Sequence, residues 1–564
     1  MAHPLYALVL ALLFFPAAAG SAEGSSSGPE DTSAAEPQRL TAEGESELRG
    51  IVAAGKLETL QRPEFGEYQA ELGDFYNSAG YALTWVVRSR PTAKARIVIK
   101  RLQAADNDGL LAQDYDSPLW ADRLAKLAVP GRPAPESELL RFDLALTVCA
   151  MRYSLDLHLG RINPRPFRSA FDVEPDIHGP SDFLRKRVLS AADVEAAFRS
   201  VEPTFPSYRR LVKAVQRYKK LSLLDDGEQL PAPETPVRPG DLYPGIPRLT
   251  RLLKLVGDLP RRAASSPRRY TGALAKAVRR FQRRHGLPPD GFLGEQTLRQ
   301  LNTPLASRLR QLQLTLERWR WLPHRFSRPP ILVNIPEFRL YAGSVQSQKV
   351  VVGMAFKHET PVFVSQLTEL VFRPPWTVPM SIQLAELLPK LEKDPSYLEK
   401  NDFEVIDGRD VVLSTGAVGA ELLARLRDGQ LYLRQRPGPH NSLGLVKFNM
   451  PNAYSVYLHG TPSRRGFWES ERDLSHGCIR VEDPGALAAW VLRDEPGWTP
   501  ARIREAMEGA GTVTVKLTEP VSVLLQYGTA AVKEGGEVSF FEDIYNRDAE
   551  EGEAFERRAR LAAR

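Results

Sequence analysis

The first pattern along the chain is helical. Apolar residues recur at helical spacing from Leu48 to Leu57 and again from Leu139 to Leu159. The run from Ala95 to Leu102 fits the same period, although its β-branched residues weaken the prediction of a helix there. Gly and Pro become frequent between Gly227 and Pro247. We therefore expect a helical scaffold domain over residues 46–240, with a domain boundary in that break.

A compact unit of three short helices is predicted next, over residues 248–304. Leu252 to Val256 should start the first helix, and the apolar face from Leu274 to Phe281 should form the second. Gly286 is a typical stop for that second helix, since glycine adopts the left-handed conformation that ends many helices. Glu295 to Leu301 should form the third helix.

Beyond Pro329 the hydrophobic period changes from about 3.6 residues to about 2, which predicts strands. The expected strands are Ile331–Ile335, Phe338–Tyr341, Lys349–Gly353, Glu369–Phe372, Glu404–Ile406, Val446–Phe448 and Val456–Leu458. Helical patterns interrupt them and predict an inserted, partly helical lid at about 385–435. We expect a β-rich domain over 328–520 and a C-terminal tail over 521–564, and hence a multidomain α+β protein.

The N-terminus predicts export. The apolar run from Leu5 to Phe15 has about 11 residues, fewer than the roughly 20 that span a bilayer, and small residues follow it. Residues 1–22 are therefore expected to be a signal peptide. Residues 23–45, rich in Ser, Gly, Glu and Ala, are expected to be a disordered linker. We predict a protein secreted across the cytoplasmic membrane.

The composition and net charge restrict the classes of partner that the protein can bind. The 564 residues carry a formal net charge of +6, and no Lys/Arg block is long enough for a nucleic-acid-binding arm. The weak positive field is compatible with an acidic polymer as partner. The two cysteines, Cys149 and Cys478, give neither a disulfide framework nor the spacing of a zinc site. Cys149 lies in an apolar helical pattern and is expected to be buried and unreactive.

The other cysteine has the surroundings of a nucleophile. Cys478 follows Ser475, His476 and Gly477, and His459 lies nineteen positions before it at the end of a predicted strand. A thiol needs a nearby imidazole or positive charge to react near neutral pH. Gly477 permits a tight turn whose N–H groups can form an oxyanion hole. From spacing alone, a buried structural cysteine beside surface histidines remains the alternative.

Two stretches of sequence resemble known families. The string Ala277-Val-Arg-Arg-Phe281-Gln282, with glycines at Gly286, Gly291 and Gly294, resembles the three-helix peptidoglycan-binding domain. His459-Gly460-Thr461 with Ser475-His476-Gly477-Cys478-Ile479-Arg480 resembles the signature of the L,D-transpeptidases, the YkuD-like domain. The strings Phe372-Arg-Pro-Pro-Trp376 and Lys447-Phe-Asn449-Met-Pro451, and the order of domains, are similar to the larger members of that family.

The resemblance implies a role for each matching residue. Cys478 would be the nucleophile and His459 its general acid/base, with the backbone N–H groups of Gly477 and Cys478, together with His476, at the oxyanion. Arg480 would hold a substrate carboxylate or order the loop; both roles stay open. The remaining expected substrate-binding residues are Ser475, Gly460, Trp376, Asn449 and Tyr432.

The resemblance also implies a reaction and a location. A tetrapeptide stem of peptidoglycan would acylate the cysteine with release of D-Ala, and a diamino acid of a neighbouring stem would take the acyl group, forming a 3→3 cross-link. No metal, nucleotide or flavin is required, carbapenem β-lactams would be inhibitors, and the enzyme would act in the periplasm, associated with the cell wall. An L,D-carboxypeptidase, an enzyme attaching protein to peptidoglycan and a non-catalytic wall-binding scaffold remain alternatives.

Overall fold

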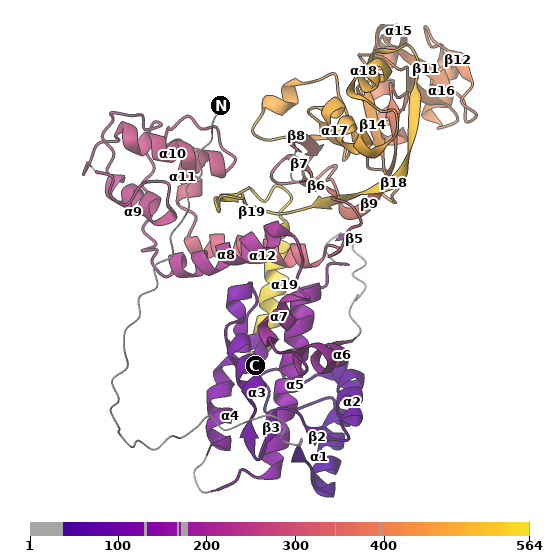
Figure 1. Ribbon diagram of the computed structural model, residues 1–564. Helices are drawn as coiled ribbons and strands as arrows, with labels where there is room; N and C mark the ends of the chain where they lie inside the picture. Colours follow the sequence, from indigo (N-terminus) through magenta and orange to yellow (C-terminus); the bar gives the residue numbers. More distant parts are fainter. Residues whose placement is uncertain are drawn as a thin grey trace, which may run out of the picture.

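The computed structural model describes residues 38–128, 132–165, 169–170, 179–264, 266–343, 346–394 and 396–562. Figure 1 shows a helical region at the bottom, two long helices (α8 and α12) across the middle, a small helical module at upper left and a β-rich domain at upper right. No helix within the described ranges is both long and apolar enough to cross a membrane. The expected signal peptide and most of the expected linker lie outside the described residues.

The lower region is a helical domain with its own apolar core. Its helices are α1 (Ala42–Ala54), η1 (Gly66–Tyr68), α2 (Gln69–Ser78), α3 (Ala93–Gln103), η2 (Ala105–Asp108), η3 (Ala112–Tyr115), η4 (Ser117–Leu119), α4 (Trp120–Leu127), α5 (Glu136–Leu159), α6 (Pro180–Phe183), η6 (Leu184–Val188) and α7 (Val194–Arg199). Its short strands are β1 (Gln38–Arg39), β2 (Ala82–Leu83), β3 (Val86–Val87) and β4 (Arg90–Pro91). Cys149 is fully buried in α5, as predicted.

Two sequence predictions for this region needed tertiary context. The stretch from Ala95 to Leu102 is helical, because Thr92 caps α3 and Val98, Ile99 and Leu102 are buried in the core. The linker prediction is wrong for its last residues, since β1 and the start of α1 lie within 23–45. Thr41 caps α1, and its backbone N–H donates to Glu136 of α5 at 3.0 Å. A residue 95 positions away in the sequence thus fixes the backbone at the start of α1.

The middle of the molecule joins the other parts. α8 (Pro206–Ser222) packs against α12 (Leu305–Arg320), and the three-helix module lies between them in sequence. The module consists of α9 (Ile246–Val256), α10 (Gly272–Arg284) and α11 (Glu295–Leu301). Leu252 to Val256 end α9 rather than starting it, because Pro247 occupies the first turn of that helix. The core of the module continues into that of the β-rich domain, so the two share one apolar interior.

The β-rich domain is built on a sheet that closes on itself. Its strands are β5 (Ser169–Ala170), β6 (Ile331–Asn334), β7 (Arg339–Ala342), β8 (Gln346–Gly353), β9 (Val362–Phe372), β14 (Val446–Asn449), β15 (Leu458–His459), β16 (Asp473–Ser475), β17 (Ile479–Val481) and β18 (Val513–Gln526). The order β14-β15-β17-β8-β7-β6-β18-β9 returns to its start because β9 also pairs with β14. The helices of this domain are η8 (Arg465–Trp468), α17 (Pro484–Val491), η9 (Leu492–Asp494) and α18 (Pro500–Glu508).

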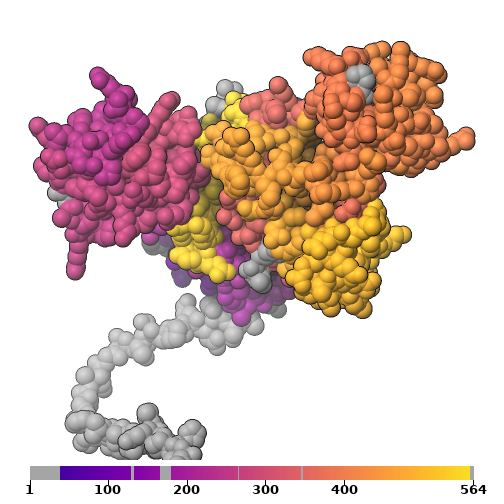
Figure 2. Space-filling view, turned by 90° about the horizontal axis from the view of Figure 1, so that it is seen from above, coloured from indigo at the N-terminus to yellow at the C-terminus, as the bar shows by residue number. Residues whose placement is uncertain are grey.

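The predicted lid is a small unit with its own core. Its sheet has the order β10-β13-β11-β12. The elements are β10 (Trp376–Thr377), α13 (Met380–Ile382), η7 (Gln383–Leu387), α14 (Leu388–Lys393), α15 (Tyr397–Lys400), β11 (Phe403–Ile406), β12 (Val412–Ser414), α16 (Ala420–Arg427) and β13 (Tyr432–Gln435). Its apolar side chains, from Val378 to Leu433, form a cluster separate from the main core. Figure 2 shows this unit, orange, at the opposite side of the molecule from the magenta three-helix module.

The prediction of a C-terminal tail over 521–564 is wrong. Its first residues lie inside β18, the strand that pairs with both β6 and β9. The hairpin of β19 (Ala530–Val532) and β20 (Val538–Phe540) follows, and α19 (Arg547–Ala562) then lies among the scaffold helices (Figure 1). The segment is an integral part of the fold because it completes the sheet and contacts the helical scaffold.

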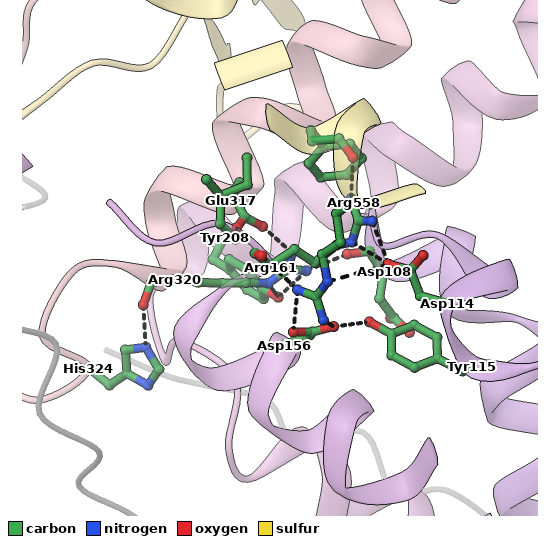
Figure 3. Close-up of polar contacts among 12 residues, drawn as sticks. Asp108, Asp114, Tyr115, Asp156, Arg161, Tyr208, Glu317, Arg320, His324 and Arg558 are labelled. Atoms are coloured by element: carbon green, nitrogen blue, oxygen red, sulfur yellow. Dashed lines mark hydrogen bonds and ion pairs between the residues drawn. The ribbon is translucent and has the colours of Figure 1, made fainter. Parts of the chain in front are cut away.

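A buried charged cluster anchors α19 in the scaffold (Figure 3). Arg558 donates to Asp156 of α5 at 2.9 Å and to the carbonyl of Arg161 at 2.6 Å. Arg161 is paired with Asp114, and both side chains are fully buried. Tyr115 donates to Asp156 at 2.7 Å. Because a buried charge that loses its partner is costly, these contacts fix the end of the chain against α5 and η3.

Candidate active site

Three neighbouring strands place a row of polar side chains on one face of the closed sheet. In the β14–β15 pair Lys447 lies opposite His459, and in the β15–β17 pair His459 lies opposite Arg480. Directly paired residues point to the same face of a sheet. The register therefore brings two cations and the predicted general base together, immediately beside the turn that contains Cys478.

The turn from Ser475 to Cys478 is held by internal hydrogen bonds. Gly477 has φ +107°, a conformation that residues with a Cβ rarely adopt. The Ser475 hydroxyl donates to the Cys478 carbonyl at 2.6 Å and accepts from the Gly477 N–H at 3.2 Å. This corrects two expectations. Ser475 is buried and stabilises the turn instead of facing substrate, and the Gly477 N–H is already occupied, whereas no hydrogen bond among the described residues uses the Cys478 N–H.

The thiol of Cys478 has polar and cationic neighbours. It lies 3.7 Å from the Ser455 carbonyl and hydrogen-bonds the Tyr457 side chain. The Lys447 ammonium is 4.3 Å from the centre of the Tyr457 ring. Burial raises the pKa of the thiol, while Lys447, Tyr457 and Arg480 act in the opposite direction. The resting thiol is therefore largely protonated at neutral pH, and it needs a base to become a nucleophile.

His459 is buried in a neutral form that can serve as this base. Its Nδ1 lies 2.5 Å from the Gly460 carbonyl, an acceptor, so Nδ1 carries the proton; the Leu443 carbonyl is a second backbone partner of the ring. Burial, then the charge of Arg480, lowers the pKa of His459 to about 3. Gly460 thus orients the imidazole through its carbonyl, a role different from the predicted substrate contact. Among the described residues no hydrogen bond joins His459 to the Cys478 thiol.

His476 faces the lid instead of the thiol. Its Nε2 lies 2.5 Å from Glu386 of η7, and its ring centre is 4.8 Å from that of His358. This contact connects the lid to the cysteine turn. The side chain of His476 therefore contacts the lid, and the role of His476 at the oxyanion stays a prediction.

The other predicted substrate-binding residues differ in how closely their contacts connect them to Cys478. Trp376 hydrogen-bonds Tyr457, which in turn contacts Cys478, so it belongs to the site. Asn449 lies two residues beyond Lys447 on β14 and donates to Glu369 at 2.8 Å. Tyr432 lies in the lid sheet opposite Ile406. Within the described part of the chain, no side-chain hydrogen bond or ring contact joins Tyr432 to the cysteine turn.

Sequence reasoning gave no role to Lys447, Tyr457 and Glu386. The first two could have been found from strand alternation, because residues near His459 on paired strands share its surroundings. Glu386 could not, since its proximity to His476 depends on how the lid packs. Neither Lys447 nor Arg480 forms an ion pair with any described residue, which leaves two half-buried cations next to the thiol.

The charge of Lys447 should promote formation of the Cys478 thiolate. Lys447→Met removes a nearby positive charge, so the pKa of the thiol should rise and alkylation by iodoacetamide at pH 7 should slow by about 3- to 10-fold. The measurement is the alkylation rate as a function of pH. Lys533→Met, at an exposed lysine paired with Glu537, is the control. A pH profile unchanged by Lys447→Met would contradict this role.

Comparisons with known proteins assign each region. Residues 328–516 match the family model described as "L,D-transpeptidase catalytic domain", residues 245–301 match "Putative peptidoglycan binding domain", and residues 70–215 match "Scaffold domain". A protein of Haemophilus influenzae named "Putative L,D-transpeptidase" is 34% identical over 223 residues. That match covers 39% of this chain and 44% of the relative, so the two are similar over less than half of either length. The β-rich domain that holds Cys478 and His459 is thus similar to the catalytic domains of L,D-transpeptidases, and two other regions of the chain are similar to a scaffold domain and a peptidoglycan-binding domain.

Proposed function

We propose that this protein is a cysteine-dependent peptidoglycan L,D-transpeptidase that forms 3→3 cross-links. The observation that carries the proposal is the position of the Cys478 thiol. It lies in a glycine turn, next to the Lys447–His459–Arg480 row, inside a domain similar to the catalytic domains of L,D-transpeptidases. Acyl transfer by a thiol needs a base and a hydrogen-bond donor for the oxyanion. The site offers a buried neutral imidazole, a backbone N–H and two cations. Among the described residues, the N–H has no hydrogen-bond partner and the cations have no ion-pair partner.

The first half of the proposed reaction is acylation of Cys478. His459 Nε2 takes the thiol proton as sulfur attacks the carbonyl of the third residue in a tetrapeptide stem. The carbonyl oxygen becomes an oxyanion that the Cys478 N–H stabilises. When the C–N bond to D-Ala breaks, His459 returns the proton to the departing amine, leaving a thioester. Arg480 or Lys447 would bind a carboxylate of the stem.

The second half transfers the acyl group to a neighbouring stem. The side-chain amine of a diamino acid attacks the thioester, His459 accepts the amine proton, and the proton returns to sulfur as the C–S bond breaks. An amide forms and the free thiol is restored. The lid, joined to the cysteine turn through Glu386 and His476, would cover the bound stems and limit competition from water.

The other domains fit this role. A peptidoglycan-binding module on the same chain would raise the effective concentration of stems near Cys478. The peptidoglycan-related domains indicate association with the cell wall. We infer that the protein is secreted and works in the periplasm, where this polymer lies.

The test is the product formed from purified muropeptides. Tetrapeptide muropeptides incubated with the native protein should give a cross-linked dimer with loss of one D-Ala, detected by mass spectrometry, and Cys478→Ala should give none. A tripeptide product alone would indicate an L,D-carboxypeptidase. A product formed only with added wall-attached protein would indicate protein attachment, and no product at all would leave a wall-binding scaffold.

A further inference from the structure

The C-terminal segment reaches the cysteine turn through two buried residues. The Tyr545 hydroxyl donates to the Gly353 carbonyl at 2.5 Å and accepts from the Thr360 N–H at 3.2 Å. The Thr360 hydroxyl donates to the Gly477 carbonyl at 2.8 Å and accepts from the Gly353 N–H at 2.9 Å. Thr360 is fully buried and Tyr545 is 3% exposed, so water does not compete for these bonds. A continuous chain of hydrogen bonds therefore runs from Tyr545 to the peptide that precedes Cys478.

The geometry of a peptide group gives this chain a consequence for catalysis. The Gly477 carbonyl and the Cys478 N–H belong to the same planar trans peptide, in which they point in opposite directions. Holding the Gly477 oxygen on Thr360 consequently fixes the direction of the Cys478 N–H. Ser475 holds the next carbonyl, that of Cys478. Because Gly477 itself has wide conformational freedom, this peptide would rotate more easily without Thr360.

The loop that carries Thr360 fits closely against the turn. A Cβ on Gly353 would lie 1.9 Å from the His358 carbonyl oxygen, and one on Gly477 would lie 3.7 Å from the same oxygen. Arg547 pairs with Glu359 at 3.6 Å, which ties the same loop to the start of α19. The loop can hold Thr360 in place because it is confined from both sides.

Tyr545 is also fixed by contacts of the C-terminal segment with α12. Its N–H donates to the Tyr527 hydroxyl at 2.7 Å, and Tyr527 donates to Asp543 at 2.6 Å. Two residues of α19, Asp548 and Glu551, pair with Arg318 of α12 at 2.6 and 2.8 Å. The position of Tyr545 therefore depends on the packing of α19 against α12.

We propose that Thr360 and Tyr545 are positioning residues that aim the Cys478 N–H at the oxyanion formed during acylation. The proposal rests on the proposed function, in which Cys478 forms the thioester. The C-terminal segment would then have a specific role, because it connects the scaffold to the Cys478 N–H, a backbone donor that no described residue occupies.

Two reactions of the same thiol separate positioning from general damage. Acylation by a carbapenem passes through a tetrahedral oxyanion, whereas alkylation by iodoacetamide does not. Thr360→Val removes the hydroxyl with little change of volume. We expect it to slow carbapenem acylation and the turnover of muropeptides by about 10²-fold, the loss typical of a misplaced oxyanion donor, with iodoacetamide alkylation close to the native rate.

Milder variants keep the test decisive. Thr360→Ser retains the hydroxyl and should restore most of the acylation rate. Tyr545→Phe removes one hydroxyl and should show the same selective loss to a smaller extent, while Tyr81→Phe in the scaffold should show none. Equal losses in acylation and alkylation, or native acylation in both Thr360→Val and Tyr545→Phe, would overturn the proposal. Failure of the proposed function would look different, because the native protein itself would then form no cross-linked dimer from muropeptides.

Discussion

A carbapenem is expected to form a single covalent adduct with the native protein, and none with Cys478→Ala. The β-lactam carbonyl is a strained amide that the Cys478 sulfur can open, leaving a thioester. The second thiol cannot substitute for the first, because Cys149 is fully buried in α5 and burial raises its pKa well above the ordinary value. The measurement is the mass of the intact protein after incubation.

The matched control is Cys149→Ala, which should still form the adduct at the native rate if it folds. Limiting iodoacetamide should give the same selectivity, labelling Cys149 only after unfolding. An adduct that persists in Cys478→Ala would refute the assignment of the nucleophile. The assignment would also be refuted if the protein were active on muropeptides while no thiol reagent formed an adduct at Cys478.

Replacing His459 with glutamine should lower the rate of acylation by about 10²- to 10⁴-fold, the usual contribution of a general base. Glutamine preserves much of the side-chain volume but cannot take the thiol proton. His440→Gln is the control, since that histidine side chain is 80% exposed. The measurement is the second-order rate of carbapenem acylation in both variants.

The pH profile of the native enzyme adds a second readout. Because burial and Arg480 lower the pKa of His459 to about 3, the imidazole is already neutral and able to accept a proton throughout the range from pH 5 to 8. Acylation should therefore show no inflection near pH 6.5, where an ordinary histidine becomes protonated. An inflection near that pH that disappears in His459→Gln would contradict the buried, neutral base.

Much of the architecture could be predicted from the sequence because local patterns specify it. Helical spacing predicted α5, and alternation predicted β6, β7 and β8 to within a few residues. The cysteine turn could be predicted as well, since Gly477 is the residue type that tolerates its positive φ. The burial of Cys149 followed from apolar neighbours within the same helix.

What the sequence alone could not determine depends on contacts between distant segments. The row of Lys447, His459 and Arg480 requires the registers of three strands, and a shift of one residue would turn these side chains to the other face. The role of residues 521–564 depends on β18 pairing with strands far away in the chain and on Arg558 reaching Asp156, 402 residues earlier. Charged, polar sequence at a chain end has the same local pattern whether it is solvated or docked, and only the partners supplied by the tertiary fold separate the two.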